Sequence, residues 1–166
     1  MIEYTIGNMF ESDAQALVNT VNTVGVMGKG VALQFKKNYH NNYKAYVEAC
    51  KKGEVKIGKM FVVRDHSLLG EKLIINFPTK TDWRKPSEYE YVSLGLDALV
   101  ETIHQYDIKS IALPPLGAGK GDLLCQKKWL FIGIQQTKLL IVFYLVFRIV
   151  LVRQTQKQMF MLDLLI

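Results

Sequence analysis

Cysteine, histidine and long apolar runs are scarce in this sequence, and each scarcity excludes a class of protein. The 166 residues contain two cysteines and three histidines. Neither Cys50 nor Cys125 belongs to a close Cys/His cluster, so we expect no metal site. Two thiols in a chain of this size are typical of a reducing cytosol, which predicts a cytoplasmic protein. Residues 1–4 lack the basic and apolar segments of a signal peptide.

The most apolar stretch, residues 139–152, is shorter than the roughly 20 residues that a membrane span requires. We interpret it as a buried strand or helix that completes the core, with a membrane anchor as the minor alternative, and we expect no membrane partner. Apolar residues make up 49% of the chain, enough for the core of one domain. The net charge of +6 suits a nucleotide or nucleic acid as partner, although solubility alone explains it equally well.

Short apolar runs alternate with segments of helical periodicity through the first three quarters of the chain. The predicted strands cover 2–6, 16–18, 60–63, 73–75 and 110–113. The predicted helices start after Gly30, span 42–52 with a stop at Gly53, and follow a capping box formed by Ser87 and Glu90. This alternation predicts a three-layer α/β fold.

Two glycine-rich segments follow predicted strands. Residues 19–30 contain three glycines and lead into a helix, an arrangement that lets the backbone approach a phosphate. Asn19 and Asn22 in this segment carry donors and acceptors that suit ribose hydroxyls. Residues 116–121 alternate glycine with other residues and suggest a second amide cradle for phosphate. Ligands of open α/β sheets bind beyond the carboxyl ends of strands, where both segments are expected. An ordinary strand-to-helix turn is the alternative for the first segment.

A third segment, residues 76–84, is also expected to follow a strand, which places Lys80 near the same rim. A lysine amine is a nucleophile or base only when it is neutral, a form that burial or a neighbouring cation favours. A solvated lysine is the alternative. Trp83 beside Arg84 suggests a stacking face and a phosphate contact, with a partly buried core tryptophan as the alternative. No spacing indicates a Ser/His/Asp triad or a pair of carboxylates.

Taken together, these segments resemble a known family. Residues 16–36, the run 76–80 (Asn-Phe-Pro-Thr-Lys) and the run 114–119 (Pro-Pro-Leu-Gly-Ala-Gly) are similar, in this order, to three motifs of DarG-type macrodomains. The resemblance covers residues 1–123. It implies a three-layer α/β/α macrodomain with a mixed central sheet and an ADP-ribose cleft at the strand ends.

The resemblance also implies an activity: an ADP-ribosyl glycohydrolase that removes ADP-ribose from thymine bases of single-stranded DNA, as the antitoxin of a DarT-type toxin. The implied partners are therefore ADP-ribose, ADP-ribosylated single-stranded DNA and that toxin, without a cofactor. Asn22 and Lys80 are the implied catalytic pair, and Trp83 and Arg84 are our candidates for DNA contact. The expected ADP-ribose contacts are Asn8, Met9, Asn19, Thr20, Gly28, Lys29, Gly30, Val31, Pro115, Leu116, Gly117, Ala118, Gly119, Lys120 and Gly121.

The sequence departs from the family pattern after residue 123, where the expected Gly-Leu-x-Trp segment and amphipathic helix are replaced. We therefore divide the chain into a macrodomain-like region, 1–123, and an atypical segment, 124–166. That segment either completes the same domain or reflects an altered reading frame. Three rival functions stay open: a reader that binds ADP-ribose without hydrolysing it, an enzyme acting on protein-linked ADP-ribose, and an inactive protein.

Overall fold

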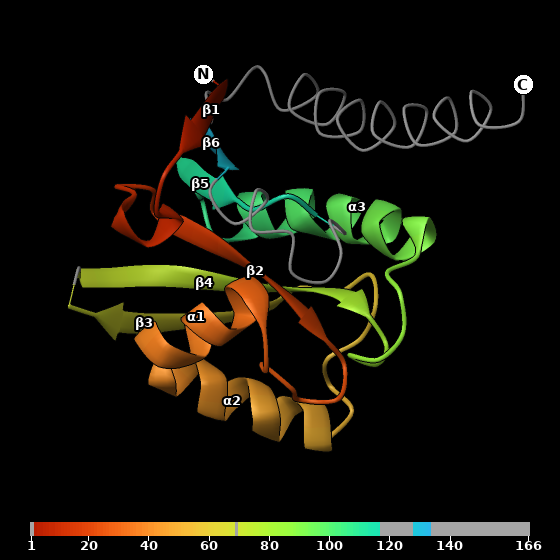
Figure 1. The fold of residues 1–166 in the computed structure, drawn as a ribbon. Coiled ribbons are helices and arrows are strands. Elements are labelled where there is room, and N and C mark those ends of the chain that lie inside the picture. The colour runs from red at the N-terminus through yellow and green to blue at the C-terminus, as the bar shows by residue number, and fades with distance from the viewer. Residues whose placement is uncertain (1, 69, 117–127, 134–166) are drawn as a thin grey trace, which may run out of the picture. The chain divides into compact units, whose positions relative to one another are not determined.

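The computed structural model describes residues 2–68, 70–116 and 128–133 (Figure 1). The chain divides into two units, residues 1–134 and 135–166, and the second unit lies outside the described residues. The proposed division at residue 123 stays a prediction. No helix among the described residues is long and apolar enough to cross a membrane.

Six strands form one mixed sheet in the order β1-β6-β5-β2-β4-β3. Their bounds are β1 Ile2–Ile6, β2 Ala16–Asn22, β3 Phe61–Ser67, β4 Gly70–Lys80, β5 Ser110–Leu113 and β6 Lys128–Gly133. Strand β2 pairs in parallel with both β4 and β5, whereas β3 pairs antiparallel with β4. Strand β6 pairs antiparallel with both β1 and β5, so β1 runs in the same direction as β5. The carboxyl ends of β1, β2, β4 and β5 therefore meet at one edge of the sheet.

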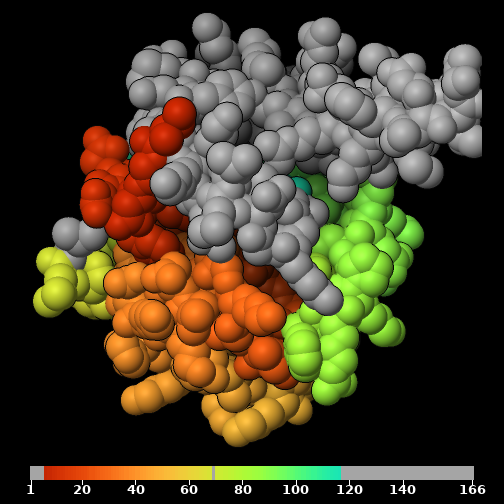
Figure 2. Space-filling view, viewed as in Figure 1, coloured from red at the N-terminus to blue at the C-terminus, as the bar shows by residue number. Residues whose placement is uncertain are grey.

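Helices cover both faces of the sheet, which confirms the predicted three-layer architecture. Helices α1 (Gly30–Asn38) and α2 (His40–Lys51) lie on one face, and α3 (Tyr89–Gln105) lies on the other (Figure 1). Leu17 of β2 packs with Phe35 of α1. Phe77 of β4 pairs with Thr20 of β2. Side chains alternate between the two faces of a strand, so Thr20 and Phe77 lie on the face opposite Leu17. On that face the Phe77 ring lies against Gly95 of α3. In the space-filling view the residues of α1 and α2, in orange, form the lower part of the near face (Figure 2).

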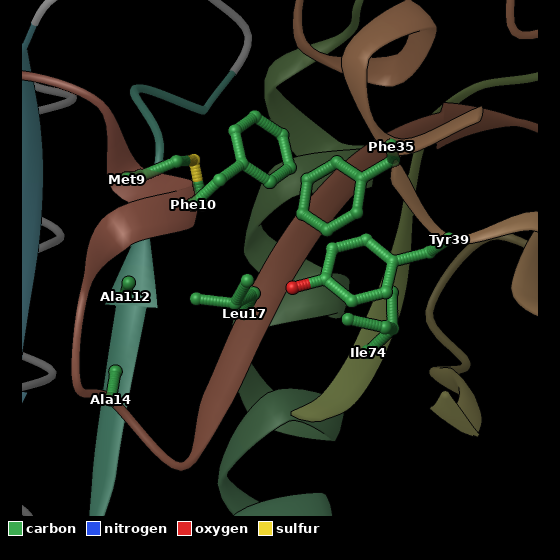
Figure 3. Packing of buried hydrophobic residues seen from close by; sticks show 8 residues of the cluster. All are labelled: Met9, Phe10, Ala14, Leu17, Phe35, Tyr39, Ile74 and Ala112. Carbon is green, nitrogen blue, oxygen red and sulfur yellow. The ribbon is translucent and has the colours of Figure 1, made fainter. Parts of the chain in front are cut away.

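The core on the α1 face is aromatic. Phe10, which follows β1 in the short 3-10 helix η1 (Met9–Glu11), packs edge-on against Phe35 with ring centroids 4.8 Å apart, and Phe35 packs against Tyr39 at 5.8 Å (Figure 3). Leu17 and Ile74 complete the cluster from the two central strands. Burying each such side chain contributes about 1.5–3 kcal/mol, so this cluster anchors the segment after β1 to the sheet.

Two predicted details are wrong and one element was not predicted. Ser87 does not cap α3, because the helix begins after Glu88 and Glu88 is its N-cap residue. The Glu88 side chain makes no cap bond, and the buried Ser87 hydroxyl has no hydrogen-bond partner. Residues 76–80 do not follow a strand, because β4 continues through Lys80. Strand β6 is an element that sequence patterning did not predict.

Candidate functional site

The predicted site segments leave the sheet at the shared carboxyl edge. Residues 7–9 follow β1, residues 23–30 follow β2, residues 81–84 follow β4 and residues 114–116 follow β5. This edge is where open α/β sheets bind ligands. The topology thus brings together segments that lie more than 100 residues apart in the sequence.

Asn22 and Lys80 are direct neighbours across the parallel ladder of β2 and β4, of which they form the last pair. Adjacent strands are about 4.8 Å apart, so the two backbones lie within side-chain reach of a common ligand atom. The register shifts just before this pair, because Pro78 faces Val21 while Lys80 faces Asn22. Proline is tolerated here because the ladder of β3 with β4 ends earlier, at Asn76, and because the strand is irregular at this point.

The Asn22 side chain organises the loop that follows it. Its Oδ1 accepts hydrogen bonds from the backbone N–H groups of Val24 at 3.0 Å and Val26 at 3.2 Å. Its Nδ2 donates to the Val26 carbonyl at 2.6 Å. An asparagine amide carries two N–H bonds, so the second is the one that can reach a ligand. Asn22 is 6% exposed, so only a small part of the residue is open to solvent.

Tyr46 of α2 holds Asn22 in place by hydrogen bonding. Its hydroxyl lies 2.7 Å from the Asn22 main-chain oxygen and 3.1 Å from Oδ1. Burial, and then the Cys50 thiol, raise the pKa of the Tyr46 phenol, so the group remains a donor at neutral pH. Sequence reasoning missed this residue because it occupied the apolar face of a predicted helix and was taken as core.

Residues 28–31 lead directly into the amino end of α1. Gly28 and Lys29 are exposed, while Gly30 and Val31 are half-buried. Gly30 has φ +60°, a left-handed conformation that disfavours any side chain, and an added Cβ would meet open space. Lys29 occupies the N-cap position without a side-chain cap bond. The first N–H groups of α1 are therefore available to an anionic ligand.

Three of the expected ADP-ribose contacts have other roles in the fold. Asn19 is fully buried and donates to Asn76 Oδ1 at 3.0 Å, so it lies beneath the edge rather than at its surface. Met9 is 4% exposed and packs in the aromatic core. Asn8 is exposed, but its Oδ1 caps η1 by accepting from Phe10 N and its Nδ2 donates to Glu11. Thr20 is half-buried in the middle of β2.

The segment after β5 is described only in part. Pro115 and Leu116 are half-buried and follow β5 toward the carboxyl edge. The expected phosphate cradle, Gly117, Ala118, Gly119, Lys120 and Gly121, lies outside the described residues. Its role stays a prediction.

Trp83 and Arg84 form an exposed pair next to Lys80. Trp83 is 45% exposed, so a large part of its side chain is open to solvent. The Arg84 guanidinium lies over its ring, 4.7 Å from the centroid, and Asp82 fixes the turn by accepting from Arg84 N at 2.8 Å. One ring face thus carries a cation, an arrangement that suits contact with a base and its phosphate.

A buried amide network beneath the site was also missed. Asn76 Nδ2 donates to Asn42 Oδ1 at 2.7 Å, and the Asn42 backbone N–H donates to Asp65 Oδ2 at 2.7 Å. All three side chains are at most 1% exposed. Buried amides and carboxylates are retained only when they are bonded, so this network fixes α2 against β3 and β4. Within the described ranges, no three potential metal-ligating side chains come together.

Comparison with known proteins identifies relatives over the region just described. The Macro domain family model matches residues 18–127. A protein of Thermus aquaticus named DNA ADP-ribosyl glycohydrolase is 56% identical over 123 residues, which is 74% of this chain and 34% of the relative. A protein of Mycobacterium tuberculosis with the same name is also 56% identical, over 74% of this chain and 35% of the relative. The chain thus spans about a third of the length of these relatives.

Solved structures agree with these sequence matches. The macrodomain of Mycobacterium tuberculosis DarG superposes with a TM-score of 0.66 at 56% identity, over 70% of this chain and 77% of that one. The structure of Thermosipho africanus DarTG in complex with ADP-ribose gives a TM-score of 0.64 at 39% identity, over 70% of this chain and 33% of that one. The three-layer fold and the resemblance inferred from the motifs are confirmed.

Proposed function

Because this chain belongs to the macrodomain family, we propose that it is an ADP-ribosyl glycohydrolase that removes ADP-ribose from thymine bases of single-stranded DNA. The observation that carries the proposal is the pairing of Asn22 with Lys80 at the carboxyl ends of β2 and β4. A module that only reads ADP-ribose has no need of an amine beside the ribose. The names of the two relatives that are 56% identical support the same reaction.

In this proposal Lys80 acts on the anomeric carbon of the distal ribose, and Asn22 orients that ribose. In one route the neutral Lys80 amine attacks that carbon, the bond to the base breaks, the base takes up a proton, and water then releases ADP-ribose and regenerates the amine. In the other route the amine moves a proton that opens the ribose ring before water completes the cleavage. In both routes the free N–H of Asn22 holds a ribose hydroxyl, and fixed dipoles stabilise the developing charge.

The amino end of α1 and the loop before it hold the rest of the ligand. We assign Gly28–Val31 to the distal ribose and the segment 117–121 to the diphosphate. The ADP-ribose complex of the Thermosipho africanus relative supports an ADP-ribose site in this fold. Asn19 and Met9 are buried, so in this proposal they support the site from within the fold instead of touching the ligand.

A toxin partner follows from the relatives. The Thermosipho africanus protein, 39% identical over 142 residues, is named as a fusion of a DNA ADP-ribosyl transferase with a DNA ADP-ribosyl glycohydrolase. A glycohydrolase joined to the transferase whose product it consumes suggests a reversing pair. We therefore propose that this chain reverses the action of a DarT-type toxin.

The experiment is release of ADP-ribose from an ADP-ribosylated thymidine oligonucleotide by the full chain and by Lys80→Ala. We expect the substitution to abolish release while free ADP-ribose still binds within a few-fold, because the rest of the pocket supplies most of the affinity. Lys44→Ala, on the exposed side of α2, is the matched control and should leave release unchanged. Undiminished turnover by Lys80→Ala would show that the amine has no part in the reaction.

A further inference from the structure

Strands β2 and β4 end at their last ladder pair, Asn22 and Lys80. One side-chain hydrogen bond connects the two segments that follow. The Thr23 hydroxyl donates to the Thr81 carbonyl at 2.8 Å. Thr23 is the residue after Asn22, and Thr81 is the residue after Lys80. The bond therefore links the two residues that would form the next pair if the ladder of β2 and β4 continued.

Thr23 is itself held in place by the residue before it. Asn22 Oδ1 accepts from Val24 N at 3.0 Å, so the backbone of Thr23 lies inside a turn that the Asn22 side chain closes. The connection thus runs from the Asn22 amide through the turn to the Thr23 hydroxyl, and from there to the carbonyl of Thr81, the residue after Lys80. It ties the backbone that follows Asn22 to the backbone that follows Lys80 by bonds of normal length.

The need for such a connection follows from the lysine side chain. Its four-carbon stem has many rotamers, so the amine is placed accurately only if its Cα is fixed relative to the ribose. The shift at Val21 and Asn22 interrupts the regular ladder directly before this point. Displacement of a reacting group by about 1 Å can lower turnover about a hundredfold.

We infer that Thr23 is a positioning residue, whose hydroxyl sets Lys80 against Asn22 through the Thr81 carbonyl. This inference rests on the proposed glycohydrolase function for its catalytic consequence. Thr23 does not contact the reacting atoms in this scheme. Because the side chain is half-buried and lies outside the aromatic core cluster described above, we expect its hydroxyl to contribute more to the placement of Lys80 than to stability.

The test compares Thr23→Val, which keeps the shape but removes the hydroxyl, with Thr23→Ser, which keeps the hydroxyl. We expect Thr23→Val to lower kcat on the modified oligonucleotide by about 10- to 100-fold. KM, free ADP-ribose affinity and Tm should stay close to those of the parent chain, and Thr23→Ser should restore kcat to within about threefold. A parental kcat in Thr23→Val, an equal loss in affinity or Tm, or a failure of Ser to rescue would overturn the inference.

A second measurement separates this inference from the proposed function. The rate at which an amine-reactive acylating reagent labels Lys80, measured by peptide mass spectrometry, does not require turnover, and the exposed Lys44 serves as the internal standard. We expect Thr23→Val to change the Lys80 rate relative to Lys44 by about threefold or more, and Thr23→Ser to restore it. If the parent chain releases no ADP-ribose but this pattern holds, the function is wrong and the positioning is right. Equal labelling in all three chains would refute the positioning.

Discussion

The Tyr46 hydroxyl lies within hydrogen-bond distance of two oxygens of one residue, the main-chain oxygen and Oδ1 of Asn22. A residue of α2 thereby fixes both the backbone and the side chain at the end of β2. Tyr46 is fully buried, so no water replaces its hydroxyl if that group is removed. This contact adds to the three hydrogen bonds that hold the Asn22 amide to the backbone of Val24 and Val26.

Tyr46→Phe should therefore lower both stability and turnover. The ring still fills its place in the core, but the two Asn22 oxygens lose a donor, at a cost of about 1–3 kcal/mol in the free energy of unfolding. Turnover should fall more than ADP-ribose affinity, because the Asn22 amide loses one of the contacts that fix its direction. Urea denaturation and steady-state kinetics measure the two effects. Tyr43→Phe, at a half-buried position of the same helix, is the control and should have little effect on either.

The same residue predicts a pH dependence of stability. Burial raises the pKa of the Tyr46 phenol above its ordinary value of 10.0. As the pH rises past 10, the unfolded chain loses this proton before the folded chain does, so the contribution to stability is full below pH 10 and declines above it. The parent chain should lose stability between pH 10 and 11 more steeply than Tyr46→Phe. Parallel slopes in urea titrations over this interval would contradict the assignment.

Asp65 supplies α2 with the cap that its own N-terminus lacks. The N-cap residue Tyr39 makes no side-chain cap bond, whereas Asp65 Oδ2 accepts from Asn42 N at 2.7 Å and Oδ1 accepts from Asn41 Nδ2 at 2.9 Å. Asp65→Ala leaves the buried Asn42 N–H without its acceptor and should cost about 1–3 kcal/mol in the free energy of unfolding. Asp97→Ala, at an exposed position of α3, should change it by less than about 0.5 kcal/mol. Similar urea midpoints for both variants would argue against the cap.

Gly95 permits the closest approach of α3 to the sheet. A Cβ at this position would lie 2.3 Å from two carbons of the Phe77 ring. Alanine favours a helix by about 1 kcal/mol over glycine, but forcing the ring aside costs about 1–3 kcal/mol or more. Gly95→Ala should therefore lower Tm, and Phe77→Leu in the same chain should recover part of the loss. Ser93→Ala, two residues away on α3, should not lower Tm; a loss equal to that of Gly95→Ala would exclude the ring overlap as its cause.

Local patterns predicted the layers of this fold and the edge at which the site lies. Apolar runs indicated β2 and β5, the glycine stop at Gly53 follows the end of α2, and parallel strands place their carboxyl ends together. Lys80 could be placed at that edge for this reason. Its pairing with Asn22, by contrast, depends on a register shift between strands that lie about 60 residues apart, and no local pattern specifies such a shift.

Other roles could not be predicted, because they depend on which residue lies next to the side chain in the folded structure. Tyr46 has the spacing of a core residue, and only the approach of Asn22 gives its hydroxyl a role. Ser87 and Glu90 match a capping box, yet α3 begins one residue later than the box requires, with Glu88 at the N-cap position. Asn19 has the chemistry of a ribose ligand, but the residue is buried against Asn76. Residue type and spacing could not distinguish these outcomes.

The salt dependence of the activity tests whether the ADP-ribose that the enzyme removes is attached to single-stranded DNA. If single-stranded DNA is the substrate, phosphate contacts release counterions, and activity on a modified oligonucleotide should fall as salt rises while activity on a modified mononucleoside falls much less. The exposed pair Trp83 and Arg84 lies beside Lys80 and is placed to meet the neighbouring nucleotide. Trp83→Ala should cost about 1–3 kcal/mol of oligonucleotide affinity, because the free face of the ring stacks a base.

Arg84→Ala should flatten the salt dependence, since one phosphate contact is lost. Lys109→Ala is the matched control, because this exposed lysine precedes β5 and lies at the opposite edge of the sheet. It should leave both the affinity and the salt slope unchanged. Initial rates at several salt concentrations, on oligonucleotide and mononucleoside, give both quantities. Equal salt dependence for the two substrates, with no effect of Trp83→Ala or Arg84→Ala, would favour an ADP-ribose reader or a protein-directed enzyme over one that acts on DNA.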